Sequence, residues 1–203
     1  MNFAVAFLIV LANVLGAGMI LPQVLRVHQT RSTAGVSLSG TGVGIVMNLW
    51  WVVYGLEAGV PGMIPVSVAG SLLYATIAFQ SLRLLGLDAA RSIAKGILSY
   101  GVVPLGPYLL TDIRTLGLVI GLMYTVQFAP AAVAAVSTSD PTGISLLTWT
   151  MALLEAVIWL AYGIITRDIA LTVGGVGGSA MASLIILQLT SHRGRSRRLV
   201  PLV

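Results

Sequence analysis

The chain has few charged residues and no cysteine. Of its 203 residues, 8% are charged, compared with about 25% in an average soluble domain. Without cysteine it forms no disulfide, uses no thiol nucleophile and holds no cysteine-ligated metal. His28 and His192 are far apart in the sequence, and no P-loop, G-x-S-x-G or H-E-x-x-H pattern is present. We therefore predict that the chain is not an enzyme and uses no metal or other cofactor.

Apolar residues dominate what is present. They make up 57% of the chain, and the mean hydropathy is +0.99. The long unbroken apolar runs exclude the alternating strands of a membrane barrel. At about 20 residues per span, the chain has room for six or seven membrane helices, and the expected fold class is an all-α membrane protein. The predicted spans lie near 3–26, 38–57, 62–84, 92–111, 114–135, 146–166 and 168–190.

The positions of the basic residues favour seven spans over six. With seven spans and the N-terminus outside, nine of the 11 Lys and Arg residues lie on the cytoplasmic side, leaving Arg114 and Arg167 outside. Six spans would leave one basic cluster outside. The net charge of +5 is thus explained by membrane topology, with the tail His192–Arg198 close to anionic lipid. We expect a multi-pass protein of the cell membrane with a cytoplasmic C-terminus and no nucleic-acid partner.

The chain repeats itself at an offset of 108 residues without gaps. The matches are mostly Pro, Gly, Ser, Gln and aromatic residues, which carry more weight than apolar matches in such a chain. They include Pro22 with Pro130, Gly35 with Gly143, Ser37 with Ser145, Trp51 with Trp159, Tyr54 with Tyr162 and Gly70 with Gly178. Each copy holds three spans, and the fourth span inverts the chain between them, so the two triplets are expected to be parallel. We predict repeats at 1–86 and 113–190, a linker helix at 87–112 and a basic tail at 191–203.

Several repeated residues are candidates for function. Pro22 and Pro130 break the helical hydrogen bonding at equivalent places and are predicted to form hinges or kinks. Trp51 and Trp159 could stack on a sugar ring from one face of a cavity, or could belong to the aromatic belt at the membrane interface. Tyr54 fits the belt. Trp50 points elsewhere on its helix and is expected to contact lipid or pack against a neighbour.

Two further side chains are polar within apolar spans. Asn48 shares a helix face with Trp51, and could bond a solute hydroxyl or a neighbouring helix. Glu155 is the only acidic residue well inside a predicted span. It could carry a proton, bind a cationic group or stay protonated as part of the packing, and function is favoured by default for such a residue.

Small and polar residues line one face of the third and seventh spans. Ser67 and Ser71 share a face in the third span, and Gly175 and Ser179 share one in the seventh. Such residues could line a polar cavity or let helices pack closely. Around Gly35-x-Ser37 and Gly143-x-Ser145 we expect a glycine turn followed by a serine N-cap.

These motifs resemble those of a known superfamily. Pro22-Gln23, followed by Thr30 to Ser37, resembles the PQ-loop motif, and Asn48 to Gly55 resembles the second-helix signature of SWEET and SemiSWEET sugar transporters of the PQ-loop (MtN3/saliva) superfamily. The second copy has the same layout, with Pro130-Ala131 in place of Pro-Gln. The resemblance covers about residues 5–190.

The resemblance implies transport of a small sugar down its gradient by alternating access. The family pocket uses a Trp on the second helix of each triplet, matched by Trp51 and Trp159, and an Asn on the third, where this chain has Ser67 and Gly175. Other PQ-loop proteins move amino acids with protons, and Glu155 keeps that alternative open. A membrane receptor or scaffold is a third alternative, and assembly into a homo-oligomer stays open.

Overall fold

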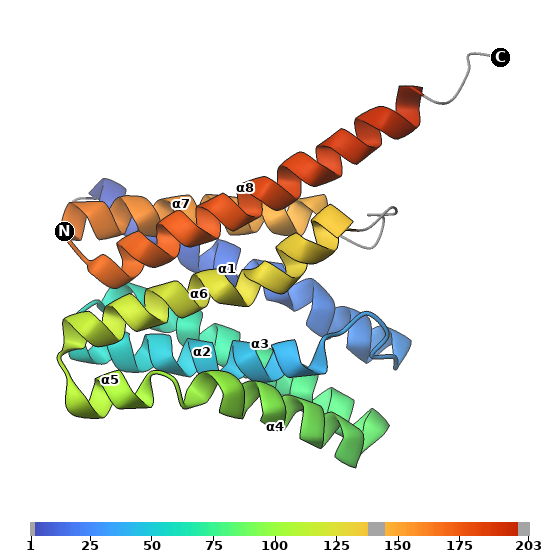
Figure 1. Ribbon diagram of the computed structural model, residues 1–203, viewed down its shortest axis with the longest axis horizontal. Helices are drawn as coiled ribbons and strands as arrows, with labels where there is room; N and C mark the ends of the chain where they lie inside the picture. The colour runs from blue at the N-terminus through green and yellow to red at the C-terminus, as the bar shows by residue number, and fades with distance from the viewer. Residues whose placement is uncertain (1–2, 138–144, 199–203) are drawn as a thin grey trace.

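The computed structural model describes residues 3–137 and 145–198, and these residues form helices joined by short connections (Figure 1). The elements are α1 (Phe3–Thr30), α2 (Leu38–Glu57), the 3-10 turn η1 (Pro61–Met63), α3 (Ile64–Leu85), α4 (Leu87–Gly101), α5 (Leu105–Leu110), α6 (Ile113–Ser137), α7 (Leu146–Thr166) and α8 (Ile169–Arg198). No strand occurs among the described residues, and the predicted all-α fold class is confirmed.

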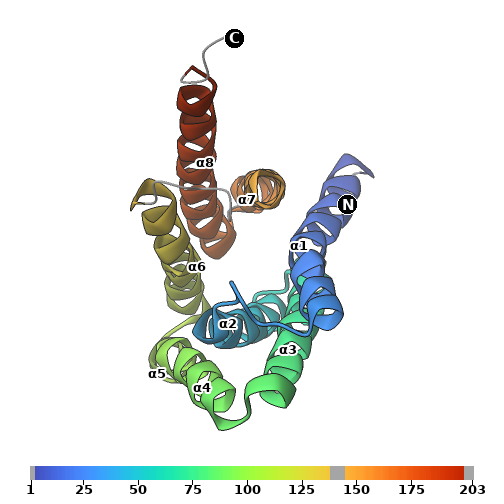
Figure 2. The same cartoon turned by 90° about the vertical axis from the view of Figure 1, so that its right-hand side faces the viewer.

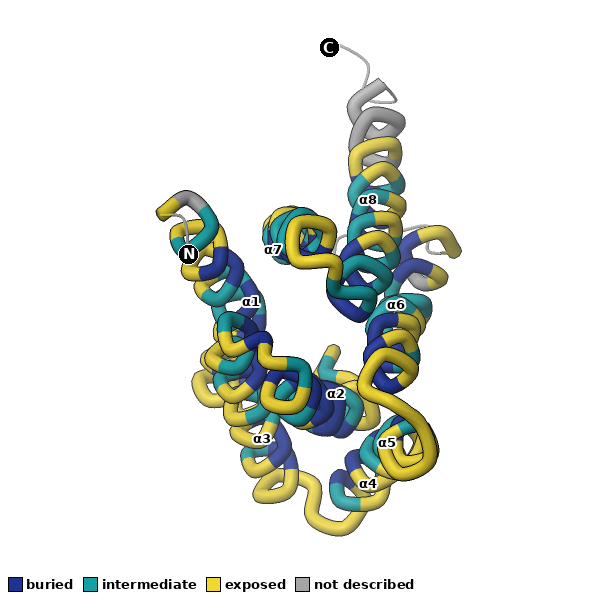
Figure 3. The backbone as a smooth tube through the Cα atoms, turned by 90° about the vertical axis from the view of Figure 1, so that its left-hand side faces the viewer, coloured by how far each residue is buried: buried dark blue, intermediate teal, exposed yellow. Residues whose placement is uncertain are grey.

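Seven segments cross the length of the bundle. Six are long and apolar enough to span a membrane: Val5–Thr30, Pro61–Leu85, Leu87–Leu110, Ile113–Ser137, Leu146–Thr166 and Ile169–Ser191. The seventh is α2, which holds Asn48, two tryptophans and Tyr54 among its apolar residues and packs against α3, α4 and α6. Large apolar side chains such as Leu25, Phe79 and Leu187 are exposed on the outside, and exposed residues cover the outward faces of the helices (Figure 3). The protein is therefore a multi-pass, all-α membrane protein.

The two triplets pack in the same way. In the first, α3 contacts both α1 and α2, and in the second, α8 contacts both α6 and α7. The triplets meet through α1 with α7 and through α2 with α6, and α4 covers the outside of α2 and α3 (Figure 2). In Figure 1 α1 and α6 start at the same end of the bundle, so the triplets run parallel. The repeat limits at residues 86 and 113 stay predictions.

The predicted serine cap before the second helix of each triplet is confirmed, and so is the predicted glycine turn before α2. The Ser37 hydroxyl accepts a hydrogen bond from the Gly40 N–H at 3.0 Å at the start of α2. The Ser145 hydroxyl does the same for the Thr148 N–H at 3.2 Å at the start of α7. Gly35 has φ +77°, the left-handed conformation that glycine adopts without strain. Gly143 lies outside the described residues.

The fourth span begins earlier than its predicted limit near residue 92, at the predicted first residue of the linker helix 87–112, and it is broken. It starts at Leu87, directly after Gly86, rather than near residue 92, and it divides into α4 and α5 at Val102–Pro104. The indole N–H of Trp50 on α2 donates to the Gly101 carbonyl at 3.1 Å, and its ring meets Tyr108 edge-on at 5.8 Å. Trp50 is thus a packing residue that holds both pieces of the linker, because it satisfies a carbonyl at the break.

We expect Trp50→Phe to lower the free energy of unfolding by about 1 kcal/mol, since it removes this hydrogen bond but keeps an aromatic ring. Thermal unfolding of the purified protein in detergent measures the change. Trp149→Phe is the matched control, because Trp149 packs against Phe128 on α6, far from the linker in sequence. Equal losses in the two variants would contradict a specific role of Trp50.

Three other helices, α1, α6 and α8, bear on predictions about helix shape and length. Pro22 lies inside α1 and Pro130 inside α6, both exposed in helices that continue past them. Their role as hinges stays a prediction. The predicted end of the seventh span near residue 190 agrees with the apolar span Ile169–Ser191, and the helix α8 continues beyond that span to Arg198. No proline interrupts the sequence before Pro201, so the basic stretch can extend the helix.

One charged group outside the spans has a defined role. Asp112 precedes α6 and accepts a hydrogen bond from the Thr115 backbone N–H at 2.7 Å, which caps the helix. The hydrogen bonds from Thr115 favour the charged form, so the pKa of the Asp112 carboxyl is lowered below its usual value.

Candidate solute-binding pocket

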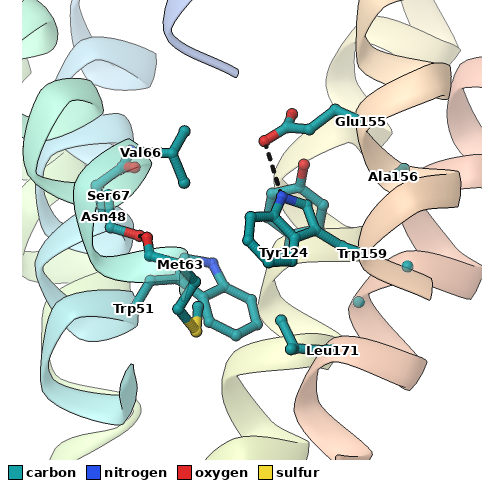
Figure 4. A pocket seen from close by; sticks show the side chains of 12 residues that line it. Asn48, Trp51, Met63, Val66, Ser67, Tyr124, Glu155, Ala156, Trp159 and Leu171 are labelled. Carbon is teal, nitrogen blue, oxygen red and sulfur yellow. Dashed lines mark hydrogen bonds between the residues drawn. The ribbon is translucent and has the colours of Figure 1, made fainter. Parts of the chain in front are cut away.

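A pocket lies between the two triplets (Figure 4), with about 480 Å³ of space not occupied by protein atoms, open solvent included. It is lined by Asn48, Trp51, Met63, Val66, Ser67, Tyr124, Glu155, Ala156, Trp159, Leu171, Gly174 and Gly175. Residues from the first triplet and residues from the second face one another across it. Parallel-repeat transporters place their solute at such an interface.

Most residues that line the pocket form pairs 108 positions apart, the same offset at which the sequence repeats. Ten of the 12 lining residues form five equivalent pairs: Asn48 with Ala156, Trp51 with Trp159, Met63 with Leu171, Val66 with Gly174 and Ser67 with Gly175. The other two, Tyr124 and Glu155, correspond to Gly16 and Met47, which do not line the pocket. The pocket is therefore pseudo-symmetric in its position but asymmetric in its chemistry.

The two tryptophans occupy equivalent places on this lining. Each is only 8% exposed. Trp51 meets Tyr54 edge-on with ring centroids 6.0 Å apart, and Trp159 meets Tyr162 in the same way at 6.0 Å. Trp51 also contacts Tyr124 edge-on at 6.0 Å. This placement puts both indoles beside the pocket rather than in an interfacial belt.

Glu155 is a buried carboxylic acid on the α7 side of the pocket. Its side chain is 5% exposed, and its Oε1 accepts a hydrogen bond from the Trp159 indole N–H at 3.3 Å. Its Oε2 is buried and has no hydrogen-bond donor among the described residues. Gly16 on α1 makes room for this group, because a β-carbon there would lie 2.5 Å from Oε1.

The polar groups opposite Glu155 come from α2 and α3. The Asn48 amide donates to the Gly44 carbonyl at 2.7 Å, and the Ser67 hydroxyl donates to the Met63 carbonyl at 3.0 Å. A β-carbon at Gly70 would lie 2.5 Å from the Asn48 Oδ1, so the glycine lets this amide stand beside α3. Asn48 therefore presents an amide oxygen, and Ser67 a hydroxyl oxygen, on the first-triplet side.

The structure brings six of the predicted site residues together: Asn48, Trp51, Ser67, Glu155, Trp159 and Gly175 all line the pocket. Ser71 and Ser179 do not line it, and their buried hydroxyls have no partner in the described part of the chain. Pro22, Gln23 and Pro130 also lie outside the lining. Gly175 additionally serves close packing, since a β-carbon there would meet the Leu160 backbone.

Sequence reasoning missed Tyr124 and several apolar lining residues. Met63 with Leu171 and Val66 with Gly174 could have been found as equivalent positions on the helices that follow the tryptophans. Tyr124 has no such signal, because its counterpart is a glycine. The groups that the structure describes include no cluster of three or more histidine or acidic side chains able to hold a metal.

Tyr54 also differs from expectation. Rather than lying in an interfacial belt, it is 3% exposed, and its hydroxyl donates to the Asp168 Oδ2 at 2.9 Å. Asp168 precedes α8, and its Oδ1 accepts from the Leu171 N–H at 2.9 Å. This hydrogen bond therefore joins the end of α2 in the first triplet to the start of α8 in the second.

The buried core is distributed unevenly along the bundle. At the end where α1 begins, which we call the N-terminal end, one cluster joins both triplets, with Ile9 and Val60 from the first and Leu116 and Ala170 from the second. Towards the other end, where α8 finishes and which we call the C-terminal end, two clusters each belong to one triplet: Ile20, Val24 and Ile77 in the first, and Ala132, Ala135, Ile185 and Leu189 in the second. The triplets are thus packed together most extensively at the N-terminal end.

Comparison with known proteins gives a partial match. The chain is 28% identical over 78 residues to the sugar transporter SemiSWEET of Escherichia coli (strain UMEA 3162-1), which covers 38% of this chain and 88% of that protein. No family model matches the chain. The chain is therefore similar, over about two fifths of its length, to a protein described as a sugar transporter.

Proposed function

We propose that this protein is a membrane transporter that moves a small sugar down its gradient by alternating access. The observation that carries the proposal is the pair of equivalent tryptophans, Trp51 and Trp159, facing one pocket between two parallel triplets. Indole faces suit the apolar faces of a sugar ring, and the Asn48 and Ser67 oxygens suit its hydroxyls. The partial similarity to a sugar transporter supports the same solute class.

The uneven core supports a mechanism in which the pocket opens to one side at a time. The N-terminal end is closed by a cluster shared between the triplets and by the Tyr54–Asp168 hydrogen bond. The clusters towards the C-terminal end belong to single triplets, so the triplets can separate there without exposing these clusters. The proposal places the N-terminal end outside the cell membrane and the C-terminus in the cytoplasm, as the distribution of basic residues predicts. Pro22 and Pro130 are the proposed hinges.

A second candidate is a proton-coupled carrier of an amino acid or another polar solute. It is favoured by one observation, the buried Glu155 with its unpartnered Oε2 at the pocket. A carboxyl group that meets solute and water alternately can take up and release a proton.

Flux through the full chain in proteoliposomes distinguishes the two candidates. We expect one or more small neutral or amino-bearing sugars, from a panel that also contains amino acids, to move without a proton gradient. Flux that requires the gradient, and loses this requirement in Glu155→Gln, would favour the proton-coupled carrier. Absence of flux for every solute would contradict transport and favour a receptor or scaffold.

A further inference from the structure

The described lining of the pocket combines a carboxylate with aromatic rings and includes no basic side chain. No Lys, Arg or His is among its lining residues. Glu155 accepts one hydrogen bond through Oε1 from Trp159, while its buried Oε2 has no donor in the described chain. A buried carboxylate is strongly destabilised unless it is paired with a cation or protonated. Within the described part of the chain, no basic side chain at the pocket therefore pairs with this carboxyl group.

The asymmetry of the repeat is concentrated at this group. Where the first triplet has Met47, the second has Glu155, and where the second has Tyr124, the first has Gly16. These two differences act together, because Gly16 provides the space that the Glu155 carboxylate occupies. A neutral, nearly symmetric solute needs no such arrangement, whereas a solute charged at one end matches it.

The aromatic rings strengthen the same preference. Trp51, Tyr124 and Trp159 line the pocket together with Glu155, and Figure 4 shows the Trp159 ring and Tyr124 close to the carboxylate. The faces of such rings attract cations. A carboxylate combined with aromatic rings therefore favours an ammonium group over a hydroxyl at the α7 side of the pocket.

We propose that the preferred solute is an amino sugar, whose ammonium group pairs with Glu155 while its ring lies between Trp51 and Trp159. This inference rests on the proposed function and specifies its substrate class. The ammonium donates to the Glu155 Oε2. The remaining hydroxyls face Asn48 and Ser67 on the opposite side of the pocket.

Counterflow in proteoliposomes tests the proposal with three solutes of similar ring structure. Glucosamine carries an ammonium group, glucose carries a hydroxyl in its place, and N-acetylglucosamine carries a neutral amide. We expect the wild-type protein to transport glucosamine about tenfold better than glucose at low concentration, since a hydrogen bond to a charged group is stronger than a neutral one. Glu155→Gln should bring the ratio of glucosamine to glucose flux close to one, and Glu155→Asp should keep part of the preference.

The outcomes separate this inference from the proposed function. Glucose flux equal to or above that of glucosamine, or a preference unchanged in Glu155→Gln, overturns the inference and leaves sugar transport standing. Equal flux of the three solutes that depends on a proton gradient also overturns it, in favour of Glu155 as a proton site. No flux of any solute overturns the proposed function and the inference with it. If Glu155→Gln fails to fold, a binding measurement on the wild-type protein tests the inference instead. Quenching of tryptophan fluorescence by the three sugars reports their affinities, and glucosamine is expected to bind about tenfold more tightly than glucose.

Discussion

Trp51→Ala or Trp159→Ala is expected to reduce sugar flux at low concentration by about thirtyfold. Each indole lines the pocket, and a ring contact on the order of 80 Å² contributes about 2 kcal/mol at roughly 25 cal/mol per Å². That energy corresponds to about a thirtyfold change in affinity. Because the two residues occupy equivalent positions on α2 and α7, the two variants should lose similar amounts. Initial rates of uptake into proteoliposomes at several solute concentrations provide the measurement.

The control must separate lost binding from lost packing. Removing a buried tryptophan can itself destabilise a protein by about 3–5 kcal/mol. Trp51→Phe and Trp159→Phe keep an aromatic face and should retain more flux than the alanine variants. Trp149→Ala removes the same side chain from a position that does not line the pocket, and should leave the dependence of flux on solute concentration unchanged. Wild-type rates in both alanine variants would reject the pocket as the solute site.

Much of the fold is predictable because it depends on local signals. Long apolar runs define the spans, and Ser37 and Ser145 begin their helices by capping them. The repeat is visible because Trp51 and Trp159 are uncommon residues that match at one offset. The position of both tryptophans at the pocket follows from that repeat once the triplets are parallel, since equivalent residues then face a shared axis.

The missed features depend on distances between helices. Glu155 can be recognised as an unusual residue in its span, but the space beside it comes from Gly16 on a different helix. Tyr54 sits near the end of its helix, where a membrane belt is the ordinary expectation. Its actual partner, Asp168, is 114 residues away. No local pattern encodes that pairing, because it depends on how the two triplets meet.

The Tyr54–Asp168 hydrogen bond leads to the second prediction, that Tyr54→Phe makes the pocket more accessible from the N-terminal end. The bond joins the triplets at 2.9 Å, and the acceptor is a carboxylate. Hydrogen bonds to charged groups contribute about 1.5–3 kcal/mol, so losing it should shift the opening equilibrium at this end by at least about tenfold. Phenylalanine keeps the ring that packs against Trp51 and Gly117, so the change is confined to the hydroxyl.

Because the chain has no cysteine, a single introduced thiol can report how accessible the pocket is from each side of the membrane. A single Ser67→Cys substitution places one thiol at the pocket, and a small membrane-impermeant thiol reagent is then added to one side of sealed proteoliposomes at a time. With Tyr54→Phe, labelling from the N-terminal side should become about tenfold faster, while labelling from the other side stays the same or slows.

Tyr162→Phe is the matched control, because Tyr162 is the repeat equivalent and the structure records no hydrogen bond from its hydroxyl to any described residue. A similar acceleration in both variants, or none in Tyr54→Phe, would show that the bond does not hold this end closed. The one-sided opening would then have to rest on the shared apolar cluster around Ile9 and Leu116 alone.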